Sequence, residues 1–260
     1  MTPLTAARTH PEVFAGPVVA AGLAWWWTVD RMAGMDAGPG TDLGTLGWFT
    51  ASWAVMMAAM MLPSLAPTFA AYVTLTRGGL LGRGLLFAAG YLLTWTVAGV
   101  VAYAVFKLGK ALLSSDLAWR GGGRWLSGGV IAVAVVYQFI PLKRACLKRC
   151  RAQPADPHGA SGRRWPAALA VGVRSGTWCI GCSWTLMAAL FALGVMSLTW
   201  MALIAALVAI EKTSPWPRAA RIATATALAA LAVGILAAPH RVPGLVVPDP
   251  TAMHAIKAMG

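Results

Sequence analysis

The chain has 260 residues, of which 58% are hydrophobic and 11% are charged, and its formal net charge at pH 7 is +13. With 8 acidic and 21 basic residues, it carries too little charge to cover a soluble domain of this size. The apolar residues form long runs, so the composition indicates a polytopic membrane protein. The basic residues cluster in the links between these runs, which favours a role in membrane orientation and argues against nucleic acid as a partner.

The apolar runs predict an all-α transmembrane bundle. The run over residues 166–210 is longer than a hydrocarbon core of about 30 Å requires, so we expect it to fold back near Ser197–Trp200 as a helical hairpin. Seven spans result, or six if the hairpin does not form. In the second run, Pro63 and Pro67 are expected to end or kink the helix. Apart from the long run, the apolar runs, including this second one, cover residues 14–29, 48–65, 85–107, 126–141 and 219–238.

The distribution of positive charge predicts the orientation. The link over residues 142–165 carries seven Lys or Arg residues, so we place it in the cytoplasm. The tail of residues 1–13 is then also cytoplasmic; it lacks the pattern of a cleavable signal peptide. The transmembrane domain covers residues 14–238, and residues 239–260 form a proline-rich tail. The expected location is the bacterial inner membrane, with the lipid bilayer as the main partner.

Four of the 12 methionines lie within six positions of the second run. Met56 and Met60 are one helical turn apart, as are Met57 and Met61, so the four thioethers form two adjacent columns on one side of a helix. Thioethers are soft ligands that suit Cu(I). The alternative interpretation is packing, because methionine fills irregular gaps between helices.

The four cysteines form two close pairs, "CLKRC" and "CIGC", on either side of the basic link. If Pro141 begins a helix, Cys146 and Cys150 share one face of it. Cys179 and Cys182 also share a face, roughly 20 Å along the long run, which is the depth expected for the methionine columns. Two such pairs predict a soft-metal site or two dithiols that exchange electrons. The alternative is that they only pack as small hydrophobic residues.

Other residues extend or close this predicted line of soft ligands. Met32 and Met35 follow the first run in "DRMAGMD", where they could capture Cu(I) at the outer side, although an ordinary polar loop is the simpler interpretation. Met187 joins the site if its helix is rotated toward it. At the inner side, one hypothesis is an Arg174–Glu211 ion pair, because intramembrane charges are costly when unpaired. The alternative is that both side chains extend to the interface.

Histidine is absent from the predicted spans. All four histidines lie in tails or links, so no span offers the imidazoles of a haem site. The spans also lack the carboxylate pairs that a hydrolase would use. Haem is therefore not expected. The soft sulfur ligands make copper the expected metal, with zinc as the second choice.

The chain resembles the bacterial predicted metal-binding integral membrane proteins, a multi-span family of unknown function. The resemblance rests on four stretches that together cover most of residues 30–230. It implies a multi-span protein that binds metal, and it differs from relatives at Ser183, where they often have a third cysteine. The four stretches are "WAVMMAAMMLPSLAP" (residues 53–67), "YQFIPLKRACLKRCR" (137–151), "GVRSGTWCIGCSWTLMAALFALGVMSLTWM" (172–201) and "EK" (211–212).

These observations lead to one main hypothesis and two alternatives. The main hypothesis is a soft-metal membrane protein that moves or delivers Cu(I) between the outer face and the cytoplasm, with a metal chaperone or a membrane-complex subunit as partner. A membrane thiol–disulfide oxidoreductase that uses both cysteine pairs is the first alternative. A structural subunit of a membrane complex, in which the sulfur residues only pack, is the second.

Overall fold

The computed structural model describes residues 11–32, 43–76, 79–112, 124–152, 165–195 and 197–237. All regular secondary structure in these ranges is helical, as the apolar runs predicted. The elements are α2 (Pro11–Met32), α3 (Leu46–Thr76), the π-helix η1 (Gly79–Gly84), α4 (Leu85–Leu112), α5 (Arg124–Tyr137), α6 (Pro141–Arg151), α7 (Trp165–Leu193), α8 (Leu198–Thr213) and α9 (Pro217–Ala237).

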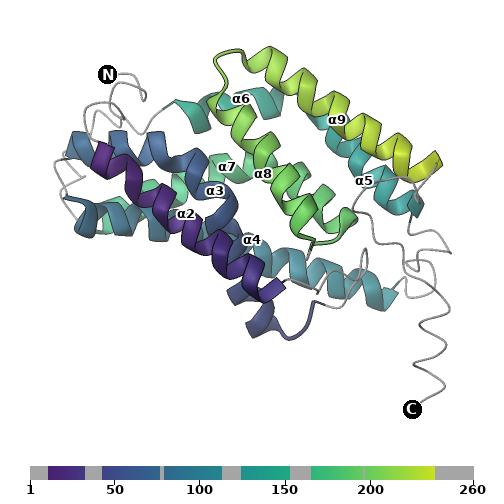
Figure 1. The fold of residues 1–260 in the computed structure, drawn as a ribbon, viewed down its shortest axis with the longest axis horizontal. Coiled ribbons are helices and arrows are strands. Elements are labelled where there is room, and N and C mark those ends of the chain that lie inside the picture. Colours follow the sequence, from purple (N-terminus) through teal and green to yellow (C-terminus); the bar gives the residue numbers. More distant parts are fainter. Residues whose placement is uncertain are drawn as a thin grey trace.

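The helices pack as neighbouring pairs around a common core (Figure 1). Helix α2 packs along α3, α4 packs along α7, and α5 packs against both α7 and α9. Helices α3 and α7 are the most buried of the long apolar helices, because each has packing partners on several sides. The two central helices are therefore the ones that carry the methionine columns and the "CIGC" cysteines.

Four described helices, α3, α4, α7 and α9, are long and apolar enough to cross a membrane, or five if the bent pair α5 and α6 is counted as one span. This number is smaller than the seven spans, or six, expected from the sequence. Helix α8 has only 16 residues, which at about 1.5 Å per residue is shorter than the hydrocarbon core. Composition and length therefore support a helical protein with four or five potential spans.

The predicted hairpin is confirmed, and of the two outcomes predicted for Pro63 and Pro67, an end or a kink of the helix, the end is contradicted. Helix α7 ends at Leu193 and α8 begins at Leu198, with Gly194 at a φ of 119° in the turn. Only glycine adopts such a backbone conformation without strain. Helix α3, in contrast, continues past Pro63 and Pro67 to Thr76. Prolines are tolerated in buried helices when neighbouring groups satisfy the freed backbone atoms.

Helix α6 begins at Pro141, as predicted, and the α5–α6 pair is bent by 69° at the break between the two helices. Proline at the first helical position costs no hydrogen bond, because that backbone N–H would be unpaired in any case. The bend turns the basic "CLKRC" helix across the end of the bundle, where it packs against α7 and α8. The cysteines of α6 are thereby brought to the cysteines of α7.

Glycines allow α4 and α7 to approach closely. A Cβ atom added at Gly172 would collide with the backbone oxygen of Phe87, and one added at Gly90 would collide with that of Leu169. A small residue on each helix lets the two backbones touch. This contact fixes the position of Tyr91, the residue after Gly90, relative to the cysteines about two to three turns further along α7.

Candidate metal centre

Three cysteines form a compact group where α6 meets α7. The Sγ atoms of Cys150, Cys179 and Cys182 all lie within 4.8 Å of one another. Cys179 and Cys182 are buried and Cys150 is half-buried, and all three are free thiols. The spacing of three residues places Cys179 and Cys182 on one face of α7. Cys150 approaches that face from the last turn of α6.

The fourth cysteine lies outside this group. Cys146 packs with Leu147 and Cys182 in a small buried cluster, and its Sγ would lie 2.8 Å from a Cβ added at Gly181. The absence of a side chain at Gly181 therefore lets α6 approach α7. The hydroxyl of Tyr137 also donates a hydrogen bond of 2.6 Å to the Gly181 carbonyl. These contacts hold α6 in the position that brings Cys150 to the other thiols.

Cys179 accepts hydrogen bonds from two side chains. The Tyr91 hydroxyl and the Lys212 ammonium each donate to its Sγ over 2.9 Å. Two donors aimed at one buried sulfur, one of them charged, suit a sulfur that carries negative charge. The thiolate is also the form of cysteine that binds metal ions. The surroundings of Cys179 thus match those of a metal ligand better than those of a packing residue.

Met61 is the methionine of α3 that reaches this site. Its Sδ lies 4.0 Å from Cys179 Sγ and 3.7 Å from Lys212 Nζ. The Lys212 ammonium also donates to the hydroxyl of Ser64 over 3.1 Å. Ser183, in turn, donates to the Cys179 carbonyl over 2.7 Å. The site therefore combines three thiols, one thioether and one ammonium, contributed by α3, α6, α7 and α8.

The other predicted methionines lie in the hydrophobic core. All of those that the structure describes are buried in the large hydrophobic core, which also contains Cys179. Their burial is consistent with both interpretations of the sequence, a path of soft ligands or packing. Met35 lies outside the described residues. The buried methionines of this set are Met32, Met56, Met57, Met60 and Met187.

The ion pair expected between Arg174 and Glu211 is wrong. The Glu211 carboxylate pairs with the Lys143 ammonium of α6 over 2.7 Å, and both side chains are almost completely buried. Arg174 is exposed on α7. A buried charge is tolerated when it is paired, and here the pair connects α6 to α8. Lys143 had been assigned to an exposed basic link, and nothing in its sequence context indicated that it is buried.

Sequence reasoning also missed Lys212 and Tyr91 as parts of the site. Lys212 follows the apolar run of α8, a position at which a lysine ordinarily extends to water, yet its ammonium contacts buried sulfur atoms. The only signal was the "EK" stretch within the family resemblance. Tyr91 lies in an apolar run with no polar neighbours that would mark it. Its role depends on the close contact between α4 and α7.

The donor set determines what this site can do chemically. Thiolate and thioether sulfur are soft ligands, and soft ligands select Cu(I), zinc and iron–sulfur centres. Structural zinc sites take four strong ligands in a tetrahedron, whereas this group offers three thiols and one thioether. The arrangement therefore fits a monovalent soft ion of low coordination number at least as well as zinc.

The fold and this site define a class: an all-helical protein, with four or five helices apolar enough to cross a membrane, that buries a cysteine cluster able to hold a metal ion. Residues 50–236 match the PpoB2 family, which is described as a copper chaperone. The chain therefore belongs to this family. No curated protein and no solved structure matches it at a significant level.

Proposed function

We propose that the protein carries Cu(I) as cargo on Cys150, Cys179 and Cys182, with Met61 as an adjacent thioether, and delivers it across or from the membrane. The observation that carries the proposal is the mutual distance of at most 4.8 Å between three sulfur atoms, in a chain of a copper chaperone family. Two of the thiols are shielded from water, which protects Cu(I) from exchange with solvent.

The buried methionines support a route to this site. In the proposed sequence of events, Met32 and Met35 capture the ion, and the column residues Met56, Met57 and Met60 pass it to Met61. Cys146 and Cys150, on the short helix α6, then exchange it with a cytosolic acceptor, and Met187 lines the path along α7. Thioethers bind metal ions without losing a proton. We expect each of these sites to bind the ion weakly enough to release it to the next, as conduction requires.

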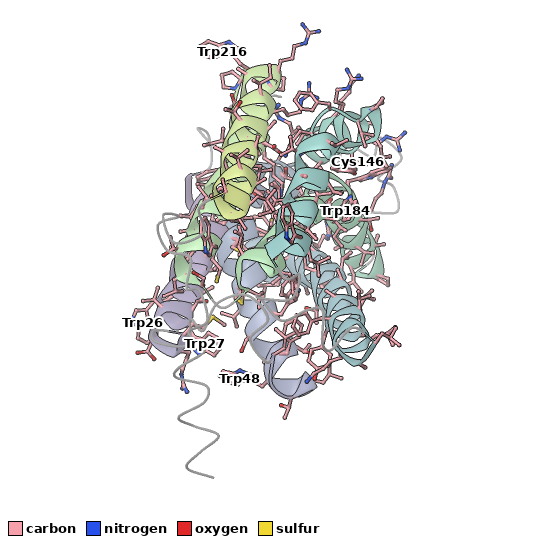
Figure 2. The ribbon with its side chains drawn as sticks, turned by 90° about the vertical axis from the view of Figure 1, so that its right-hand side faces the viewer. Trp26, Trp27, Trp48, Cys146, Trp184 and Trp216 are labelled. Atoms are coloured by element: carbon pink, nitrogen blue, oxygen red, sulfur yellow. The ribbon has the colours of Figure 1, made fainter. Side chains whose placement is uncertain are left out.

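The distribution of tryptophan supports a membrane location with α6 at the cytoplasmic end. Figure 2 shows Trp26, Trp27 and Trp48 at one end of the bundle and Trp216 at the other. Trp26 and Trp216 are 69% and 74% exposed, which decides against a role in the core. Tryptophan is enriched at both membrane interfaces. Cys146, on the basic helix α6, lies toward the Trp216 end in Figure 2, which is the end where the positive-inside rule expects basic residues if it faces the cytoplasm.

Elemental mass spectrometry of protein purified without oxygen and loaded with Cu(I) tests the proposal. We expect near-stoichiometric copper in the wild type and a loss of most of it in the Cys179→Ser/Cys182→Ser variant. Cys150→Ser should weaken binding about tenfold or more, since it removes one of the proposed ligands. Cys146→Ser is the matched control for bound copper, because it removes a cysteine of the same helix that lies outside the group of three; its proposed role in transfer to an acceptor is not measured by copper content.

Two results would contradict the proposal. Equal copper content in the wild type and in the Cys179→Ser/Cys182→Ser variant would show that these thiols do not bind the metal. A wild type without copper, in which trapping of thiols reveals a disulfide that cycles with an electron donor, would favour the thiol–disulfide oxidoreductase.

A further inference from the structure

Lys212 places a positive charge inside the sulfur cluster. Its ammonium lies 2.9 Å from Cys179 Sγ, 3.1 Å from Ser64 Oγ and 3.7 Å from Met61 Sδ. A lysine at the end of a helix would ordinarily extend its flexible side chain to water. Here the side chain instead reaches sulfur atoms from two other helices. The same atoms, Cys179 Sγ and Met61 Sδ, belong to the proposed copper site.

The charge of Lys212 is balanced by the site itself. The neighbouring carboxylate, Glu211, is already paired with Lys143 over 2.7 Å. In the part of the chain that the structure describes, Lys212 has no carboxylate partner. Its closest potential counter-ion is the sulfur of Cys179. Removing water from both groups strengthens their interaction well beyond its value at a surface.

We propose that Lys212 is a specificity-determining residue that makes the sulfur cluster favour monovalent over divalent soft ions, an inference that rests on the proposed copper-binding function. In the proposed site the half-buried Cys150 contacts the ion as a neutral thiol, while Cys179 and Cys182 bind as thiolates. These two thiolates and one Cu(I) carry a net charge of −1, which the single ammonium cancels. A divalent ion on the same two thiolates would leave the ammonium's charge uncompensated. It would also be repelled by the ammonium twice as strongly as a monovalent ion at the same position.

The pair Ag(I) and Cd(II) tests this proposal, because both ions are soft and bind thiols while they differ in charge. Each ion is titrated into the purified protein in detergent, in competition with the same soluble dithiol. The competitor corrects for the different thiol affinities of the two metals. The quantity measured is the ratio of the two apparent affinities in each variant relative to that ratio in the wild type.

The neutral variants Lys212→Gln and Lys212→Leu should raise the affinity for Cd(II) relative to Ag(I) by about tenfold or more, because a unit of repelling charge is removed at close range. Lys212→Arg keeps the charge and should leave the ratio close to that of the wild type. Lys148→Gln, an exposed change on α6 that alters the net charge equally, should also leave it unchanged. Retained Ag(I) binding shows that a variant is folded.

Other outcomes overturn the proposal. An unchanged ratio in a neutral variant that still binds Ag(I) would show that the charge of Lys212 does not select the ion. If both neutral variants lost Ag(I) and Cd(II) alike while Lys212→Arg kept both, the charge would be required for every metal and would select none. A wild type that bound neither Cu(I) nor Ag(I) would contradict the proposed function itself. The wild-type titration alone identifies this outcome, so it is not confused with a failure of the selectivity.

Discussion

The protein contains two sulfur-rich regions that differ in their surroundings. On α3, Met56, Met57 and Met60 are buried in the hydrophobic core. Where α6, α7 and α8 meet, the cysteine group has polar neighbours, among them the hydroxyl of Tyr91 and the ammonium of Lys212. Sulfur in an apolar core fills space. Sulfur that faces hydrogen-bond donors is held in a defined position and can bear charge.

The methionine columns extend from one region to the other, because Met61 contacts the cysteine group. Met61 belongs to the same run as the other three methionines, but its Sδ contacts Cys179 and Lys212. All four methionines are buried in one core, and Met61 in addition contacts a thiol and an ammonium. The difference comes from neighbouring helices rather than from the motif, and it separates a proposed ligand from residues that only line its approach.

The largest effect is expected where the thiol region is connected to α8. Lys143→Met should lower the free energy of unfolding by about 3–5 kcal/mol, because it leaves the Glu211 carboxylate buried without its partner. Thermal unfolding in detergent measures the change. Lys148→Met, on the exposed side of the same helix, serves as the control and should shift the melting temperature little. Equal shifts in the two variants would show that the buried pair does not connect α6 to α8.

A smaller effect is expected at the contact between α4 and α7. Gly172→Ala should destabilise the protein by about 1–3 kcal/mol, because the added methyl group meets the Phe87 backbone. It should also weaken copper binding, since the two helices that carry Tyr91 and Cys179 must separate. Gly129→Ala is the matched control: nothing lies within 4 Å of its added Cβ, and alanine favours the helix. A Gly172→Ala protein with wild-type stability would contradict the close contact.

The smallest effect distinguishes the methionines from one another. Met61→Leu should weaken Cu(I) binding several-fold, whereas Met60→Leu should leave it unchanged. Both substitutions conserve volume and should cost less than about 1.5 kcal/mol in stability. Competition with a soluble Cu(I) chelator measures the affinities. If Met60→Leu weakened binding as much as Met61→Leu, the methionine columns would act as a unit and the distinction between Met61 and Met60 would be wrong.

Local patterns in the sequence were sufficient to predict the individual elements. The apolar runs predicted an all-helical fold, the excess length of one run predicted the turn between α7 and α8, and Pro141 predicted the start of α6. The spacing of the cysteines placed each pair on one face of its helix. These features depend on residues close together in the chain, so they can be inferred without knowledge of the packing.

The composition of the site depends on contacts between distant segments. Cys150 lies with Cys179 and Cys182 because Gly181 lets α6 approach. Lys212 reaches Cys179 because of the rotation of α8, which no local pattern specifies. The continuation of α3 past Pro63 is likewise not specified by the local sequence, because proline removes a helix hydrogen bond and ordinarily kinks or breaks a helix. For the same reason, local sequence does not predict that Lys143 forms a buried ion pair or that Lys212 contacts buried sulfur atoms.

X-ray absorption spectroscopy of selenomethionine-labelled protein loaded with Cu(I) tests most directly whether the thiols, rather than the methionine columns, hold the metal. Selenium marks every methionine and sulfur then marks the cysteines, so the two regions give different copper neighbours. We expect copper surrounded mainly by sulfur, with at most one selenium neighbour that disappears in Met61→Leu. Copper surrounded by two or more selenium atoms would place it among the methionine columns and contradict the account.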